Sequence, residues 1–107
     1  MAENEQFIPP ASFEFLVQEF VMRAQVQLGA LHFGEEKDRP EPNLPWARHA
    51  IDTLALLLDK TRGNLTMDEQ RLIENSLTEL RFHYVRAVEE AGKRAAADEE
   101  TPAVPNE

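Results

Sequence analysis

The side chains of this chain that could do chemistry are three histidines, His32, His49 and His83, and the acids of its middle segment. His49 and Asp52 are three positions apart, so a helix would bring them close enough to share a ligand. Zinc sites usually have three or four protein ligands, and the chain has no cysteine. The pattern favours solvated or structural histidines, and we expect no metal and no cofactor.

The charged residues of the same segment also have an ordinary explanation. Arg48 and Asp52 have the i, i+4 spacing of a helical ion pair, which contributes only ~0.3–0.5 kcal/mol when exposed. A catalytic carboxyl group usually lies in a cleft that shifts its pKa. Here Asp52, Asp59 and Lys60 fall on a polar helix face. We expect a solvated surface and no enzyme; the alternative for these charges is a pair buried between two copies of the chain.

A polar run at residues 60–66 superficially resembles a phosphate-binding loop. It lacks the glycine spacing and the preceding strand that such a loop requires. Gly63 is instead placed to end a helix, and Thr66 with Glu69 has the spacing of a capping box that begins the next one. The run therefore predicts a turn between two helices.

Most of the net charge of −9 lies near the chain ends, which leaves residues 12–96 nearly balanced. A balanced body offers no basic stripe for phosphates, so we expect no nucleic-acid partner. No apolar run approaches the ~20 residues that cross a bilayer, and the first residues do not resemble a signal peptide. We expect a cytoplasmic protein without membrane contact, with disordered acidic tails at residues 1–11 and 98–107.

Proline and glycine positions divide the remaining 12–97 domain into helices at about 12–28, 44–61 and 67–97. All seven prolines lie outside helix interiors, which proline breaks, and Pro45 lies in the first turn of the second helix, where it is tolerated. Ser12 and Asn43 are suitable N-caps, and Gly29 is suitable just past the first helix. The link after the second helix is so short that the second and third helices should form an antiparallel hairpin. Residues 30–43 form a longer connection, which we expect Leu31 and Phe33 to hold to the core.

The first helix has more apolar surface than one small bundle can cover. One stripe predicts the core contact; it consists of Phe13, Leu16, Val17, Phe20, Val21, Ala24 and Leu28. A second stripe on the opposite side of the first helix consists of Phe15, Met22 and Val26. On the second helix, Trp46 lies on the side predicted to face the core, and Leu56 lies on the opposite, charged side. The expected interface residues are Phe15, Met22, Val26, Leu56 and Phe82. These side chains predict an all-α three-helix bundle completed by homodimerisation, with the long third helix contributing; the alternative is that they fold under the connection or stay loosely exposed.

Several short motifs together resemble the bacterial family known as domain of unknown function 1844. They are Ser12-Phe13, residues 25–29, 42–44, 47–48, 51–54 and 60–66, Leu80-Arg81 and Tyr84-Val85. The resemblance covers about residues 12–86 and implies a short helical protein with no catalytic residue to carry over. Its shared polar positions are Arg48, Asp52, Lys60, Thr61, Gly63 and Asn64.

The sequence predicts a non-enzymatic, self-associating interaction or scaffold module. A homodimer is the expected assembly, and a further, unidentified protein partner would fit the same function. The alternative is a small-ligand or regulatory binding protein with a site at the dimer seam near Arg48, Asp52 and Lys60.

Overall fold

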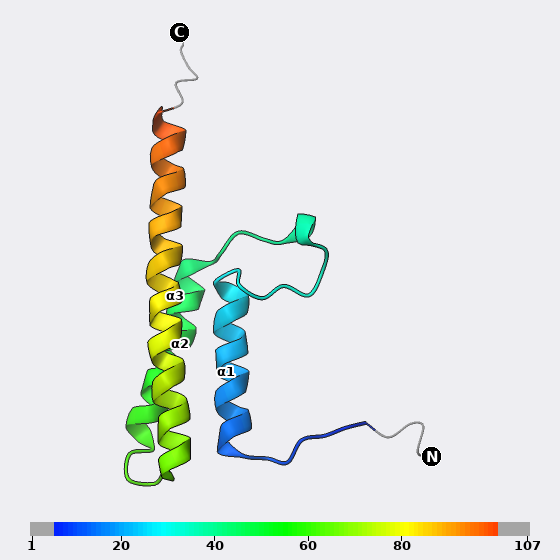
Figure 1. Cartoon of the computed structure of the whole chain (residues 1–107), viewed down its shortest axis with the longest axis vertical. Helices are drawn as coiled ribbons and strands as arrows, with labels where there is room; N and C mark the ends of the chain where they lie inside the picture. The colour runs from blue at the N-terminus through cyan, green and yellow to red at the C-terminus, as the bar shows by residue number, and fades with distance from the viewer. Residues whose placement is uncertain (1–5, 101–107) are drawn as a thin grey trace.

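The computed structural model describes residues 6–100 of the chain, with side chains to residue 97, and contains three α-helices. They are α1 (Phe13–Gln27), α2 (Leu44–Lys60) and α3 (Met67–Glu100), with a short 3₁₀ turn η2 (Glu36–Asp38) before α2. No strand occurs in this part of the chain. Each helix contacts the other two, and Figure 1 shows α2 descending from the loop while α3 climbs back beside it. The all-helical bundle predicted from the sequence is confirmed.

Side-chain caps begin all three helices at the predicted residues. Ser12 Oγ accepts a hydrogen bond from the backbone amide three residues ahead at 3.0 Å, and Asn43 Oδ1 does the same at 3.2 Å. Thr66 and Glu69 form the expected capping box, with reciprocal hydrogen bonds of 2.8 and 3.1 Å. These bonds satisfy first-turn amides that have no partner within the helix.

Glycines in the left-handed conformation reverse the chain after α1 and α2. Gly29 has φ 79° and Gly63 has φ 84°, as expected of residues just past a helix end. A Cβ atom on Gly29 would lie 3.3 Å from Cγ of Pro42, so the returning chain packs closely against the end of α1. Nothing lies within 4 Å of the corresponding position at Gly63.

One apolar core joins the three helices. Its buried residues are Val17, Ala24 and Leu28 of α1 and its C-cap, Ala47, Ala50, Ile51 and Leu54 of α2, and Ile73, Leu77 and Leu80 of α3. Two predicted core residues are exposed instead. Leu16 lies roughly 90° around α1 from the buried stripe. Trp46 lies in the first turn of α2, where its ring meets the edge of His49 with centroids 5.2 Å apart.

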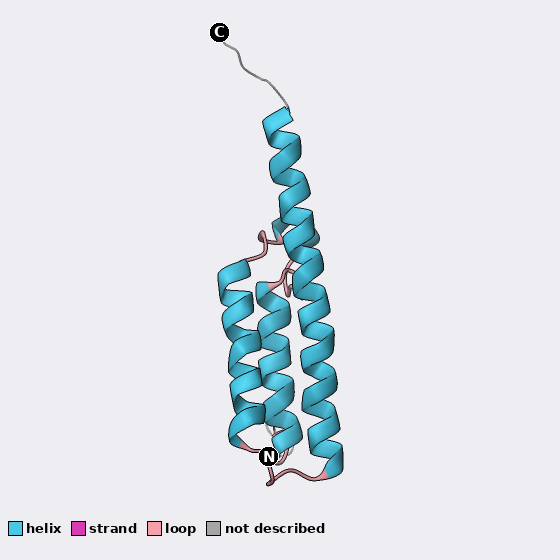
Figure 2. Ribbon diagram, turned by 90° about the vertical axis from the view of Figure 1, so that its left-hand side faces the viewer, coloured by secondary structure: helices cyan, strands magenta, loops and turns pink. Residues whose placement is uncertain are grey.

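The long helix α3 extends well beyond its two neighbours. It has 34 residues against 17 in α2, so at about 1.5 Å per residue it is roughly twice as long. Figure 2 shows its C-terminal part projecting past the bundle. An ion pair of 3.2 Å between Arg94 and Glu41 links the projecting part to the loop before α2. Residues 98–100 were predicted to belong to the tail but continue the helix, because the alanines before them are strong helix formers and proline follows only at position 102.

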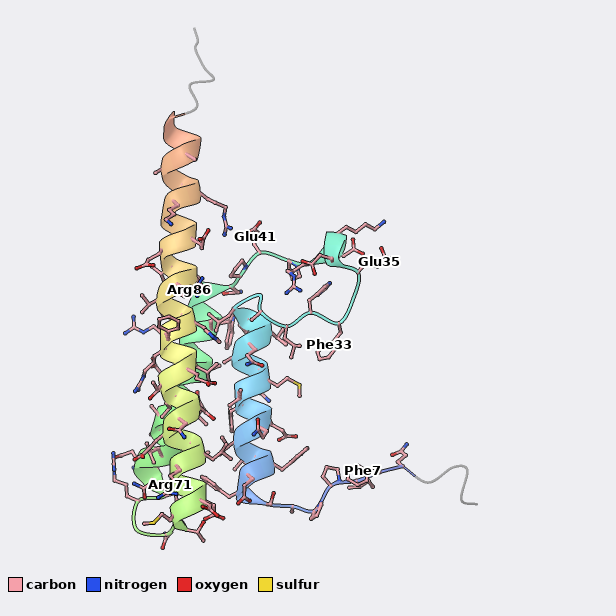
Figure 3. The ribbon with its side chains drawn as sticks, viewed as in Figure 1. Phe7, Phe33, Glu35, Glu41, Arg71 and Arg86 are labelled. Atoms are coloured by element: carbon pink, nitrogen blue, oxygen red, sulfur yellow. The ribbon has the colours of Figure 1, made fainter. Side chains whose placement is uncertain are left out.

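Arg39 holds the connection between α1 and α2. Its Nη1 donates to the carbonyl oxygen of Gly29, and its Nε and Nη2 donate to the Glu36 carboxylate at 2.8 and 2.9 Å. The hydrogen bonds between Arg39 and Glu36 lower the pKa of Glu36 and raise the pKa of Arg39. The expected anchoring by Phe33 is wrong, because its side chain is 78% exposed on the outer side of the loop (Figure 3), whereas Leu31 is partly buried.

The predicted tails lie mostly outside the described residues. Residues 1–5 and 101–107 are not described, and residues 6–11 have no regular secondary structure. Within the described chain, no helix combines the length and apolar character needed to span a membrane.

Candidate functional site

An exposed row of side chains follows the outer side of α1. The α1 strip consists of Phe15, Glu19, Met22 and Val26. Their steps of four, three and four residues keep them on one face, opposite the buried Val17 and Ala24. Phe15, Met22 and Val26 are 41%, 46% and 38% exposed, so a single subunit leaves all three in water. Together with Arg23 and Gln27, the strip lines an open hollow of about 420 Å³.

Two opposite charges lie at the middle of this apolar row. Glu19 and Arg23 are one helical turn apart, but neither forms an ion pair within the described part of the chain. The Arg23 guanidinium instead lies 5.4 Å from the centre of the Phe20 ring. The α1 surface therefore combines exposed apolar groups with one acid and one base whose charges are locally unmatched.

The remaining two expected interface residues lie on the other helices. Leu56 on α2 is 54% exposed and Phe82 on α3 is 59% exposed. Neither lines the hollow beside the α1 strip, and Arg86 lies over the Phe82 ring at 5.8 Å. The structure thus gathers Phe15, Met22 and Val26 in one place, whereas Leu56 and Phe82 are separate exposed positions.

A second concave region, the α2–α3 groove, lies between α2 and α3. It comprises two adjoining hollows of about 490 and 210 Å³. Arg48, Asp52 and Tyr84 line both of them. The larger hollow is completed by Leu44, Pro45 and His49, and the smaller one by Ile51, Arg81 and Val85. The shared polar residues Arg48 and Asp52 therefore lie in one hollow with three α3 residues. These three, Arg81, Tyr84 and Val85, also belong to the motifs of the family resemblance.

The charges in the α2–α3 groove are unequal. Arg48 Nε lies 3.7 Å from Asp52 Oδ2, which is the ion pair expected from the sequence. Arg81 has no hydrogen bond or ion pair to any residue that the structure describes. Its neighbours one helical turn away carry no carboxylate: they are Leu77, Thr78, Tyr84 and Val85. Two guanidinium groups thus share the groove with a single acid.

The other shared polar positions lie at the far end of α2. Thr61 Oγ1 donates to the carbonyl oxygen of Leu57 at 2.8 Å, and the Asn64 amide donates to the carbonyl oxygen of Thr61 at 2.9 Å. Together with the left-handed Gly63, these bonds explain the turn. Lys60 is eight residues beyond Asp52, roughly 12 Å along the helix axis. The structure therefore divides the shared motif between a groove and a turn.

The three histidines lie far apart in the chain and have separate surroundings. His49 lines the groove beside Trp46. His32 Nε2 lies 3.1 Å from the carbonyl oxygen of Glu35, and His83 is exposed on α3. Within the described residues, no three histidines or acids are grouped as metal ligands would be.

Sequence reasoning missed Arg81 and Tyr84 as members of a site. Tyr84 lies one helical turn after the buried Leu80 on α3, and its partly buried ring packs against the core. Its position in the groove depends on which faces of α2 and α3 meet. A usable signal was present for Arg81, because no acid occurs three or four residues away on either side.

The comparison with protein families agrees with the resemblance seen in the sequence. The family model described as a domain of unknown function (DUF1844) matches residues 10–86. This range includes α1, α2 and the first part of α3, and so both the α1 strip and the α2–α3 groove. No curated protein and no solved structure gives a significant match.

Proposed function

This chain belongs to the DUF1844 family, and from that membership and its surface we propose that it is a non-enzymatic interaction module that works as a homodimer. The antiparallel α2–α3 hairpin and α1 form the bundle, and a second copy covers α1. The observation that carries the proposal is the α1 strip, where three large apolar side chains are exposed on one face of a helix whose opposite face fills the core. Exposed apolar strips with polar borders are typical of protein–protein contact sites.

The charges of the strip favour a second copy as the partner. A two-fold axis places the same surface on both sides of an interface, so the surface must complement itself. The proposed register pairs two α1 helices antiparallel, with Phe15 facing Val26 of the second copy. In that register Glu19 lies beside Arg23 of the second copy, and the symmetry repeats the contact. Two ion pairs then match the charges that a single subunit leaves unmatched.

The small core gives a reason for such pairing. Single cores below about 70–80 residues rarely supply more than ~3–5 kcal/mol, and the helical body here is only slightly larger. A partner that binds only the folded state adds stability by mass action. Burial of the α1 strip therefore couples assembly to folding, and the projecting part of α3 offers further surface for contact.

Sedimentation equilibrium at micromolar concentration tests this proposal. We expect a mass about twice the 12.2 kDa of one chain. Met22→Glu should shift the protein to the monomer and raise the dissociation constant about 100-fold or more, because it places a charge opposite Glu19 of the second copy. Met67→Glu is the matched control, since Met67 is exposed at the start of α3, away from the strip. A wild-type monomer, or equal behaviour of the two variants, would contradict the proposal.

The α2–α3 groove supports small-ligand binding as a second candidate function. The groove brings charged and aromatic side chains together beside apolar ones, as ligand sites commonly do. It shares no lining residue with the hollow at the α1 strip, so binding there does not require the dimer seam that the sequence suggested. Titration with small ligands tests binding in the groove, and the mass measurements above test the homodimer, so the two candidate functions can be distinguished.

A further inference from the structure

We propose that the α2–α3 groove binds a small molecule carrying a phosphate or carboxylate group, held by Arg81, Arg48 and the hydroxyl of Tyr84. The inference deepens the second candidate function by naming the chemical class of the ligand, and it is independent of dimerisation. An oxyanion is the chemistry shared by both kinds of ligand. The three side chains that would recognise it come from two helices, so the bundle itself sets their spacing.

The state of the two arginines is the main support for an anionic ligand. Arg81 lines the smaller hollow and pairs with no acid among the residues that the structure describes, and its guanidinium offers five N–H donors in a planar fork. Arg48 Nε lies 3.7 Å from Asp52 Oδ2, a long and exposed ion pair, and within the described residues the Arg48 side chain forms no hydrogen bond. An oxyanion between the two guanidinium groups would supply the missing negative charge through short, charge-assisted hydrogen bonds.

The shape of the groove limits the size of the ligand. The hollow that contains both arginines has a volume of about 210 Å³. Pockets for drug-sized ligands usually measure ~300–1,000 Å³, so this hollow suits one oxyanion with a short organic part. Ile51 and Val85 provide an apolar wall for that part. The adjoining hollow beside Leu44 and Pro45 gives a longer ligand room to continue along α2.

The remaining charges favour a small anion over a polyanion. Asp52 lines both hollows and would repel a second negative group placed near Arg48. Nucleic acids are bound by extended basic surfaces, whereas this groove has only two arginines in a chain of net charge −9. A hydroxyl or amine on the ligand could donate to Asp52, so that one ligand would match all three charged side chains.

Nuclear magnetic resonance of the ¹⁵N-labelled full chain tests the proposal. Inorganic phosphate and acetate are titrated separately, with sodium chloride at matched ionic strength as the reference. We expect saturable shifts of the Arg81 and Arg48 Nε–H signals and of the backbone amides of Asp52 and Val85. Arg81→Gln should raise the dissociation constant about tenfold or more, because it removes a charged donor. Arg86→Gln is the matched control, since Arg86 is on the same helix but outside the groove.

Each outcome of these titrations decides the proposal. A saturable response to phosphate, to acetate or to both supports it and identifies the preferred oxyanion. Shifts no larger than those in chloride, or equal affinity in Arg81→Gln and wild type, would overturn it. Arg81→Lys provides a second variant, which keeps the charge but loses the planar fork and should bind with intermediate affinity. Sedimentation of the same samples reports on the α1 strip, so failure of the groove and failure of the dimer are distinguishable.

Discussion

The α1 strip and the α2–α3 groove are both exposed surfaces on helices, but their charges differ. The strip contains one acid, Glu19, and one base, Arg23, borders it beside the large apolar side chains. The groove carries two arginines and one acid around the partly buried Tyr84. Equal and opposite charges on one helix face can be matched by a second copy of that face. An excess of one sign favours a ligand of the other sign, so the two regions suit different partners.

The two regions also differ in how many helices determine the relative positions of their residues. All members of the α1 strip lie on α1, so their relative positions follow from helix geometry alone. The groove exists only because α2 and α3 pack with Arg48 and Arg81 on neighbouring faces. Changes within the strip should therefore affect association without affecting the groove, and changes within the groove should leave association unaffected.

Charge reversal in the strip should produce the largest effect. Glu19→Arg places a cation beside Arg23 of the second copy, and we expect the dissociation constant of the dimer to rise about 100-fold, since like charges at an interface cost several kcal/mol. The double variant Glu19→Arg with Arg23→Glu restores opposite charges and should recover most of the affinity. Sedimentation velocity over a concentration series measures both.

Glu79→Arg is the control for this reversal, because it makes the same change of net charge at an exposed position on α3. Its dimer affinity should remain close to that of the wild type. If the double variant associates no better than Glu19→Arg alone, Glu19 and Arg23 do not face each other and the antiparallel register is wrong.

A smaller effect, on the free energy of unfolding alone, is expected at Gly29, where the chain leaves α1 and packs against the segment before α2. Gly29→Ala should lower the free energy of unfolding by about 1–2 kcal/mol, because φ of 79° is unfavourable for alanine and the new Cβ would meet Pro42 at 3.3 Å. Gly92→Ala should instead raise it by roughly 0.5–1 kcal/mol, since Gly92 is helical with open space around it. Urea denaturation measures both changes.

The folded Gly29→Ala protein should keep its dimer affinity and its response to phosphate. Both surfaces consist of helix faces, and Gly29 lines neither of them. Lost association in folded Gly29→Ala protein would show that the strip depends on how the loop closes, contrary to its placement on α1 alone.

Local signals made much of the fold predictable. Ser12, Asn43 and Thr66 predicted the starts of the helices, and their hydrogen bonds are present, because capping depends only on residues within one turn. Gly29 and Gly63 adopt the expected left-handed conformation for the same reason. The exposed side of α1 was also predictable, since helical spacing alone separates Phe15 and Met22 from the core.

Features that depend on contacts between distant segments were not predictable in the same way. Phe33 was expected to anchor the loop, but Arg39 does so through Gly29, a contact between residues ten positions apart. Trp46 was placed on the core side of α2, although the first turn of that helix leaves it exposed. The groove required knowledge of how α2 and α3 are rotated toward each other, which the spacing within either helix does not contain.

The smallest effect, and the sharpest test of the charge difference, is expected at Asp52. Asp52→Asn removes the acid that partly occupies Arg48, so the dissociation constant for phosphate should fall severalfold while the free energy of unfolding changes by no more than ~0.5 kcal/mol. Asp59→Asn is the matched control, since Asp59 also pairs with an arginine, Arg62 in the turn after α2, at 3.4 Å, but does not line the groove. The same phosphate titrations measure both variants. An equal fall of the dissociation constant in both would mean that net charge alone attracts phosphate. A lower dissociation constant in Asp52→Asn alone would show that the local excess of positive charge in the groove determines its ligand. An unchanged dimer mass in that variant would show that association through the α1 strip does not depend on the charges of the groove.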